Sequence, residues 1–391
     1  LARRPKSNYV EGSLFLMAKS FYYREDWLNS QVKCSELIDK FPAGDLSPDA
    51  HLLFSKNLLV QRKFYAGEIM LSRTVDIAWQ KKRYDILSEA FRIQAELALF
   101  QNDLEKALRP YRQAIAQSDD GELRAKWQVD MASLLYRMGD FKRAEIEFGK
   151  VTRFSPDYLQ TFEAYLYRAG SLIRLGRFYE GDKILNDLAK DGKFEEWLPY
   201  VYAQMLQSMR MKTLDTNEKV LNSNKEALTQ KQKLDSLFTM EKYADSAYVN
   251  NPSLIAYYFE RGMDYYKAND WGRAKNLFAK SRMVKTPVTK TSDRLYSLLN
   301  NWDSKRRETD KYLNKPESIS ELSDSMKVTL SMNLFELGRI HEELGFKDSV
   351  EFYFSYSAGI VPMNMPESAR FLYAYSRVLK EKDPEKADSL L

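Results

Sequence analysis

The chain of 391 residues is long enough for two or three ordinary domains or for one extended array of repeats. Its 15 Gly and 12 Pro, with 44% hydrophobic and 29% charged residues, favour a patterned helical protein over a loop-rich or disordered one. The 60 Lys and Arg against 55 Asp and Glu leave a net charge of +5 that is dispersed along the chain, so no nucleic-acid partner is predicted.

The chain opens with two amphipathic segments that we interpret as the first copy of a repeated helical pair. The first segment, residues 11–23, carries the small residue Ala18, and the second begins at Trp27. In this unit a large residue follows the turn between the helices, a small residue comes three positions later, and another large residue lies beyond it. All three share one face of the second helix, because an α-helix has 3.6 residues per turn. Cys34, the single cysteine, excludes an internal disulfide and is predicted to be a buried core residue.

The same unit is clearest at about residues 125–158. Gly139 marks the turn between two helices, Ala144 lets the preceding helix approach closely, and Phe148 fills the space beside it. Two antiparallel helices of this kind cannot bury their apolar faces alone, so neighbouring pairs are expected to stack at a spacing nearer 37 than 34 residues. Further copies begin near Glu11, Pro48, Ser88, Phe162, Ile255, Leu330 and Ser368.

Residues 1–190 are therefore predicted to form an N-terminal array, and residues 191–250 an irregular helical segment or degenerate repeat. Within that segment, residues 195–211 predict an apolar helix. Residues 217–249 are polar with sparse Leu and Ala, and they fit either a long surface helix or a degenerate repeat that ends at Pro252.

Residues 251–391 are predicted to form a second array, in which Trp271 and Phe278 restore the pattern. Residues 286–325 have room for about one further helical hairpin. The chain begins at Leu1 without Met and ends inside another copy of the unit, so we expect a processed chain or a fragment. No run of eighteen apolar residues occurs, so no membrane-spanning helix is predicted.

The repeated unit resembles the tetratricopeptide repeat (TPR) family. The small, aromatic and proline positions of that family are matched by Ala132, Gly139, Phe141, Ala144, Phe148 and Pro156. The resemblance implies an all-α fold, an α-solenoid of stacked antiparallel helix pairs that forms a TPR superhelix. The tryptophan that the family carries early in the first helix is absent from most copies.

Enzymatic chemistry is not predicted. Only two histidines occur, His51 and His341, and the "HEELG" motif at His341 has Gly345 where a zinc-protease helix needs its second histidine. Glycine-rich nucleotide loops and G-x-S-x-G elbows do not occur in the sequence. We therefore expect no catalytic residue, no cofactor and no metal site, and we interpret His341 as an ordinary helix-face histidine beside acidic residues.

The first helix of each pair is expected to line the concave side of the solenoid, where extended ligands usually lie. Aromatic side chains there would anchor a partner segment, and Lys or Arg would orient it. Alternatively, several of these aromatic residues pack between adjacent repeats. The candidate partner-binding residues are Phe15, Lys19, Tyr22, Tyr23, Lys56, Arg92, Tyr136, Arg137, Tyr167, Arg174, Phe259, Tyr266 and Lys267.

These features predict a non-enzymatic protein–protein interaction scaffold or adaptor. The phrases "SELIDKFP" and "SPDAHLLFSKNLL", with the recurrent "DSL", "DSA" and "DSV", resemble bacterial TPR lipoproteins of two groups. One is the BamD-like group of outer-membrane assembly, and the other is associated with type IX secretion and gliding.

The lipoprotein resemblance implies a periplasm-facing component of an envelope complex at the inner face of the outer membrane. Its partners would be other proteins of that complex. It would contact the membrane only through these partners or through a lipid anchor upstream of residue 1. The alternative is a stand-alone soluble TPR module in the cytoplasm that binds a peptide or acts as a regulator.

Overall fold

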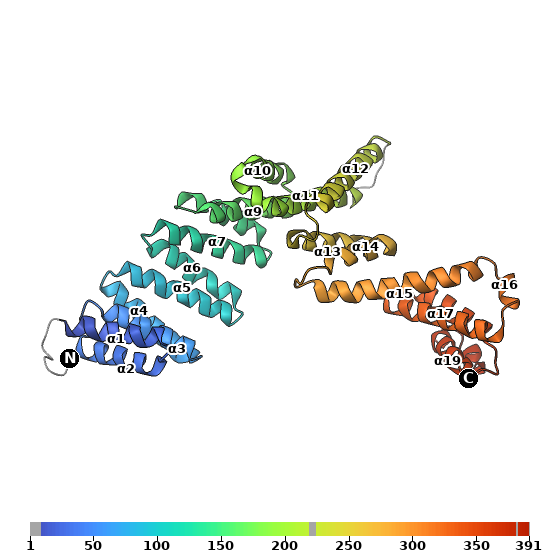
Figure 1. The fold of residues 1–391 in the computed structure, drawn as a ribbon, viewed down its shortest axis with the longest axis horizontal. Coiled ribbons are helices and arrows are strands. Elements are labelled where there is room, and N and C mark those ends of the chain that lie inside the picture. The colour runs from blue at the N-terminus through green and yellow to red at the C-terminus, as the bar shows by residue number, and fades with distance from the viewer. Residues whose placement is uncertain (1–8, 219–223, 381, 391) are drawn as a thin grey trace. The chain divides into compact units, whose positions relative to one another are not determined.

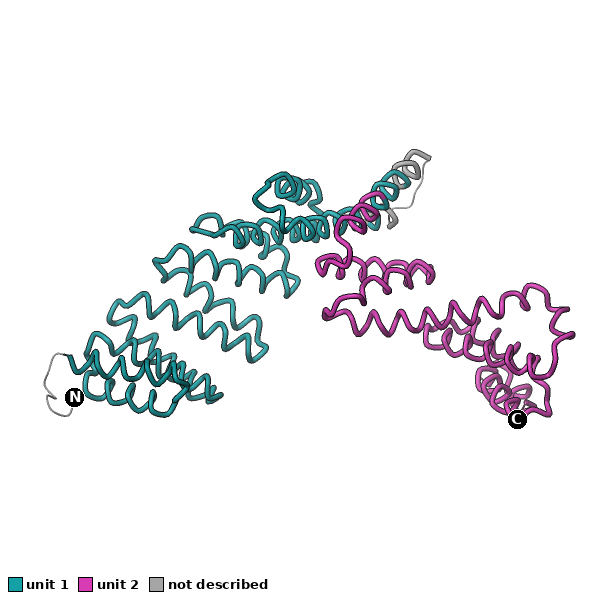
Figure 2. The backbone as a smooth tube through the Cα atoms, viewed as in Figure 1, with its two compact units in different colours: residues 1–238 teal, residues 239–391 magenta. Residues whose placement is uncertain are grey.

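The structure is a computed structural model that describes residues 9–218, 224–380 and 382–390. These residues form helices and no strand, which confirms the all-α prediction. They fall into two compact units, unit 1 with residues 1–238 and unit 2 with residues 239–391 (Figure 2). The boundary lies inside the segment that the sequence marks as irregular. The three-part division of the sequence stays a prediction.

Unit 1 is a stack of antiparallel helix pairs (Figure 1), which confirms the predicted α-solenoid. Five of its first helices begin 37 residues apart, at Val10, Ser47, Tyr84, Gly121 and Tyr158. The first helices are α1 (Val10–Tyr23), α3 (Ser47–Val60), α5 (Tyr84–Phe100), α7 (Gly121–Arg137), α9 (Tyr158–Arg174) and α11 (Leu198–Glu218). The second helices are α2 (Trp27–Lys40), α4 (Phe64–Gln80), α6 (Leu104–Gln117), α8 (Phe141–Phe148) and α10 (Phe178–Lys190).

One residue with positive φ reverses the chain inside each of these pairs. Gly139 and Gly176 have φ of 78° and 76°, a conformation that glycine adopts without strain. After Gly139, the amide of Asp140 donates to the carbonyl of Leu135 and closes the first helix. The Asp140 carboxylate then accepts from the amide of Arg143 and caps the second helix. The predicted turn at Gly139 is confirmed.

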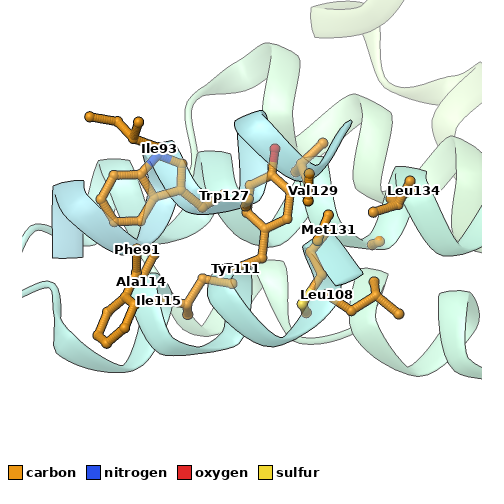
Figure 3. Close-up of a cluster of buried hydrophobic side chains, with 14 of the residues drawn as sticks. Phe91, Ile93, Leu108, Tyr111, Ala114, Ile115, Trp127, Val129, Met131 and Leu134 are labelled. Carbon is orange, nitrogen blue, oxygen red and sulfur yellow. The ribbon is translucent and has the colours of Figure 1, made fainter. Parts of the chain in front are cut away.

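Small residues lie where the two helices of a pair approach most closely. Ala132 and Ala144 are fully buried, and Phe148 fills the space beside them as predicted. A Cβ atom on Gly181 would lie only 2.8 Å from Cγ1 of Ile173, so a larger residue at Gly181 would force its neighbours apart. Figure 3 shows part of the resulting core, where side chains of α5, α6 and α7 meet.

The irregular segment contains two long helices. The apolar stretch predicted to be helical lies in α11, which contacts α9 and α10 and so continues the stack of unit 1. Within the polar stretch the structure describes α12 (Asn224–Ala247), and the choice between a long surface helix and a degenerate repeat stays a prediction. Two short 3₁₀ turns, η1 (Val151–Arg153) and η2 (Gly192–Trp197), precede α9 and α11.

Unit 2 contains further antiparallel pairs, in which α13 packs with α14, α17 with α18, and α19 with α20. The helix α15 lies between α14 and α17 and contacts both. These helices are α13 (Pro252–Lys267), α14 (Trp271–Ser281), α15 (Thr289–Leu313), α16 (Glu317–Ser320), α17 (Asp324–Glu343), α18 (Lys347–Ile360), α19 (Ser368–Leu379) and α20 (Pro384–Ser389).

The prediction of a helical hairpin in residues 286–325 is wrong. The structure has a single helix of 25 residues there, α15, followed by the short α16. The sequence of α15 contains neither Gly nor Pro, so nothing interrupts the helix. Ion pairs between residues four apart, Asp303 with Arg307 and Arg306 with Asp310, stabilise its second half.

Candidate protein-interaction surface

The candidates on α1 are mostly engaged in packing. Phe15 and Tyr22 are half-buried against the core of the first pair, and the Tyr22 ring meets Trp27 edge to face at 5.1 Å between centroids. The Lys19 ammonium lies 5.7 Å from the centre of the Phe15 ring. Tyr23, in contrast, is 76% exposed. On this helix Tyr23 is therefore the aromatic side chain most available to a partner.

The basic candidates of α3 and α5 form ion pairs. Lys56 Nζ lies 3.0 Å from Oε1 of Glu89, and Arg92 Nε lies 2.7 Å from Oε2 of the same carboxylate. Arg92 also pairs with Glu96. Burial opposes ionisation of Glu89, but its contacts with Arg92 and Lys56 lower its pKa overall. Lys56 therefore links α3 to α5 through Glu89, whereas the ion pairs of Arg92 lie within α5.

Tyr136 and Tyr167 meet between α7 and α9, with ring centroids 5.4 Å apart. Tyr136 also contacts Phe141 at 5.2 Å, and Tyr167 stacks on Phe148 at 5.8 Å. The Tyr136 hydroxyl lies 3.0 Å from the position that a Cβ of Gly170 would occupy, so a larger side chain would crowd it. Both rings pack between adjacent repeats, and each stays half-buried.

The remaining candidates lie near helix ends or in unit 2. Arg137 is exposed at the end of α7, and Arg174 is half-buried at the end of α9. In unit 2, Phe259 and Tyr266 of α13 pack on the core residue Phe278, and Lys267 is exposed. The structure thus brings together Tyr136 and Tyr167, and links Lys56 to Arg92 through Glu89. Partner binding by the candidates stays a prediction.

Three carboxylates that the sequence analysis did not single out also lie on the first helices: Glu96 on α5, Asp130 on α7 and Glu163 on α9. Asp130 and Glu163 form no ion pair with the described residues. Burial raises the pKa of both carboxyls, and at Asp130 the nearby cations Lys126 and Arg92 oppose that increase while Glu96 adds to it. At Glu163 the carboxylates of Asp130 and Asp157 add to the effect of burial. The repeat could have revealed Asp130, which stands 37 residues before Tyr167 at the same register.

Both histidines are buried, which corrects the interpretation of His341 as an ordinary helix-face residue. His51 Nδ1 lies 2.8 Å from the carbonyl oxygen of Ser47. His341 lies among aromatic rings, with centroids 5.1 Å from Trp271 and 4.9 Å from Tyr353. Neither histidine belongs to a cluster of potential ligands.

No three histidine, cysteine, aspartate or glutamate side chains come close enough to hold a metal ion within the described part of the chain. Over the same residues, no helix combines the length and apolar character needed to cross a membrane. The chemistry offered by the first helices is therefore aromatic contact and hydrogen bonding by carboxylates, hydroxyls and a few cations.

No protein-family model matches this sequence, and no curated protein matches it. Among solved structures, it is similar to a tetratricopeptide repeat protein from Parabacteroides merdae, at 17% identity and a TM-score of 0.41, over 74% of this chain and 98% of that one.

It is also similar to a structure of Naa15/Naa10 bound to HypK, at 15% identity and a TM-score of 0.43, over 97% of this chain and 62% of that one. A third similarity is to the APC/C hetero-tetramer Cut9–Hcn1, at 12% identity and a TM-score of 0.32, over 99% of this chain and 86% of that one. We draw no functional conclusion from these similarities. The helices themselves define the class of protein, an α-solenoid of antiparallel helix pairs.

Proposed function

We propose that this chain is a non-enzymatic scaffold that binds a segment of a protein partner along the first helices of unit 1. The supporting observation is a group of polar aromatic side chains from three successive first helices. The Tyr136 and Tyr167 rings meet with centroids 5.4 Å apart, and burial with the nearby Glu163, Tyr136 and Tyr200 raises the pKa of Tyr167. Tyrosines with one apolar face and one polar end are the side chains that protein interfaces favour.

The test is affinity purification of the full-length protein from its native cells. The variant combines Tyr23→Ala and Tyr200→Ala, two accessible first-helix residues. The matched control combines Tyr65→Ala and Tyr179→Ala, which are 80% and 83% exposed on second helices. We expect the amount of a constitutive partner recovered with the first variant to fall at least about tenfold. The reason is that tyrosines buried at an interface each contribute on the order of 1–2 kcal/mol to binding.

The control should retain the partner, and both variants should keep the circular dichroism spectrum of the unaltered protein. Equal retention by both variants would show that the first helices do not bind the partner.

We also propose that the scaffold faces the periplasm as part of an outer-membrane assembly or secretion machine. The support is the resemblance of "SELIDKFP" and the recurrent "DSL", "DSA" and "DSV" to envelope TPR lipoproteins. Fractionation of native cells, with protease protection of the full-length protein, tests this location. Recovery with the outer membrane supports it, whereas a cytoplasmic protein without a constitutive partner would favour the stand-alone module.

A further inference from the structure

The first helix of unit 1, α1, exposes an apolar side chain at a position that the later first helices bury. Leu16 is 67% exposed. Because these helices begin 37 residues apart, the same register is occupied by Leu53, Ala90, Trp127 and Ala164, and all four of these side chains are buried. Leu16 therefore occupies a position that belongs to a helix–helix interface, and yet it faces solvent.

In the later copies, the second helix of the preceding pair covers this face. The helix α2 contacts α3, α4 contacts α5, α6 contacts α7, and α8 contacts α9. On α3, Leu53 lies in one cluster with Cys34 of α2, and Asn57 Nδ2 donates a hydrogen bond of 2.8 Å to the hydroxyl of Ser30 on α2. The element that fits this face is therefore an α-helix packed along it.

Leu16 is the centre of a stripe that carries no charged residue, which we call the α1 stripe. The stripe consists of Tyr9, which directly precedes α1, and of Gly12, Leu16, Ser20 and Tyr23. At 3.6 residues per turn, all of them lie within about 40° of Leu16 around the helix axis. Tyr9 and Tyr23 are 82% and 76% exposed, and no described atom lies within 4 Å of a Cβ added to Gly12. The outer side of α1 is therefore open along the stripe.

The order of side chains in the α1 stripe is similar in both directions from Leu16. Four positions away on either side lies a small residue, Gly12 or Ser20, and seven positions away lies a tyrosine, Tyr9 or Tyr23. When two such helices pack antiparallel with Leu16 against Leu16, small residues face small residues and tyrosines face tyrosines. A two-fold interface between identical chains requires a surface that is complementary to itself in this way.

We propose that the α1 stripe is the interface of a homodimer, in which two copies of α1 pack antiparallel about a two-fold axis at Leu16. The interface continues the stacking contact that covers this face in every later pair of unit 1. The small residues Gly12 and Ser20 allow the helix axes to approach to about 8 Å, the short end of the usual range. This self-association does not depend on the proposed scaffold function.

The size of the α1 stripe indicates a weak dimer. Two tyrosines bury roughly 300–500 Å² in each copy, so with Leu16 the two copies together bury about 1,000 Å². That area is at the lower limit for a specific interface. We therefore expect a Kd on the order of 10 µM and a dimer that forms and dissociates with concentration.

The first experiment is sedimentation velocity of the whole 391-residue chain over about 1–100 µM, which spans the expected Kd. Leu16→Lys places two charges at the axis and should weaken dimerisation at least about tenfold. Leu28→Lys on α2 is the matched control, since Leu28 is 65% exposed and its counterpart Tyr65 on α4 is 80% exposed. The control should dimerise like the unaltered chain, and both variants should keep its circular dichroism spectrum.

The second experiment tests the arrangement by disulfide cross-linking under mild oxidation. Cys34 is fully buried, so the unaltered chain should not cross-link. Leu16→Cys should link to itself across the axis. Gly12→Cys and Ser20→Cys should link efficiently only when the two variants are mixed. Two copies of Gly12 lie eight residues apart along the antiparallel helices, about 12 Å, which is beyond the reach of a disulfide.

A monomer at every concentration overturns the proposal and leaves the α1 stripe to a helix of another chain. Equal weakening by Leu16→Lys and Leu28→Lys also overturns it, because self-association would then not use the stripe. If Gly12→Cys links to itself as readily as to Ser20→Cys, the antiparallel arrangement is wrong. Tyr23 is left unaltered in both experiments because it belongs to the scaffold test, so either proposal can fail without the other.

Discussion

His341 shows how the aromatic core of unit 2 controls a single ionisable group. Its ring is buried beside Trp271 and Tyr353, and neither of its nitrogens has a hydrogen-bond partner among the described residues. Burial lowers the pKa of His341 from its ordinary 6.5 to about 4. Between these values the unfolded chain binds a proton that the folded chain does not. The contribution of His341 to the free energy of unfolding is therefore complete above pH 6.5 and decreases as the pH falls below that value.

We expect the free energy of unfolding to decrease by up to about 1.4 kcal/mol per pH unit between pH 6.5 and about 4, relative to a His341→Phe variant. Phenylalanine fits an aromatic cluster and has no group to protonate. Urea unfolding of both proteins at several pH values measures the difference in their free energies of unfolding. Carboxylates titrate in both proteins, so their effect cancels in this difference. Parallel pH profiles would contradict this prediction.

At the scale of helices, close approach within a pair depends on residues without a large side chain. The crossing of α17 and α18 has Gly338 against Phe354, and a Cβ at Gly338 would overlap that ring. Phe354 is almost fully buried, and close-packed interiors leave a ring little room to move. This glycine is required by the tertiary contact, whereas helix propensity alone would favour alanine.

Gly338→Ala should destabilise the protein by about 1–3 kcal/mol, because overpacking outweighs the better helix propensity of alanine. Gly359→Ala in α18 is the matched control, since nothing lies within 4 Å of the added Cβ. The control should be neutral or stabilise by up to about 1 kcal/mol. Thermal unfolding of both variants tests this, and a stability change of the same sign and size in both would refute the explanation.

At the scale of the whole molecule, each hydrophobic cluster described lies within a single unit. The cluster around Leu135 and Phe148 belongs to unit 1, and the one around Phe278 and Leu337 belongs to unit 2. In repeat proteins each pair contacts only its neighbours, so stability is a sum of local contributions. Loss of a core side chain is therefore expected to open the helices around its own cluster first.

Leu135→Ala in unit 1 and Leu337→Ala in unit 2 remove fully buried side chains, and each should cost about 2–5 kcal/mol. Hydrogen exchange followed by mass spectrometry should show lost protection only in peptides of the altered unit. Each variant serves as the control for the other. Loss of protection throughout the chain in either variant would show that the two units unfold together.

The repeat could be predicted from the sequence because it depends on short-range spacing. Gly139, Ala144 and Phe148 specify a turn, a close approach and a filling side chain within one helix pair, and all three have those roles in the structure. Glu25 and Arg62 form turns of the same conformation, with φ of 62° and 61°. The sequence did not predict these turns because Glu and Arg rarely adopt positive φ.

Stacking of the pairs decided which side chains meet, and the sequence could not show this. Lys56 and Arg92 share Glu89 because α3 lies against α5. The Tyr111 ring reaches from α6 toward Trp127 and Val129 of α7 (Figure 3). The period of the helix and the size of its residues thus determined the solenoid from the sequence alone. The charges and hydroxyls offered to a partner became clear only when helices distant in the sequence were placed side by side.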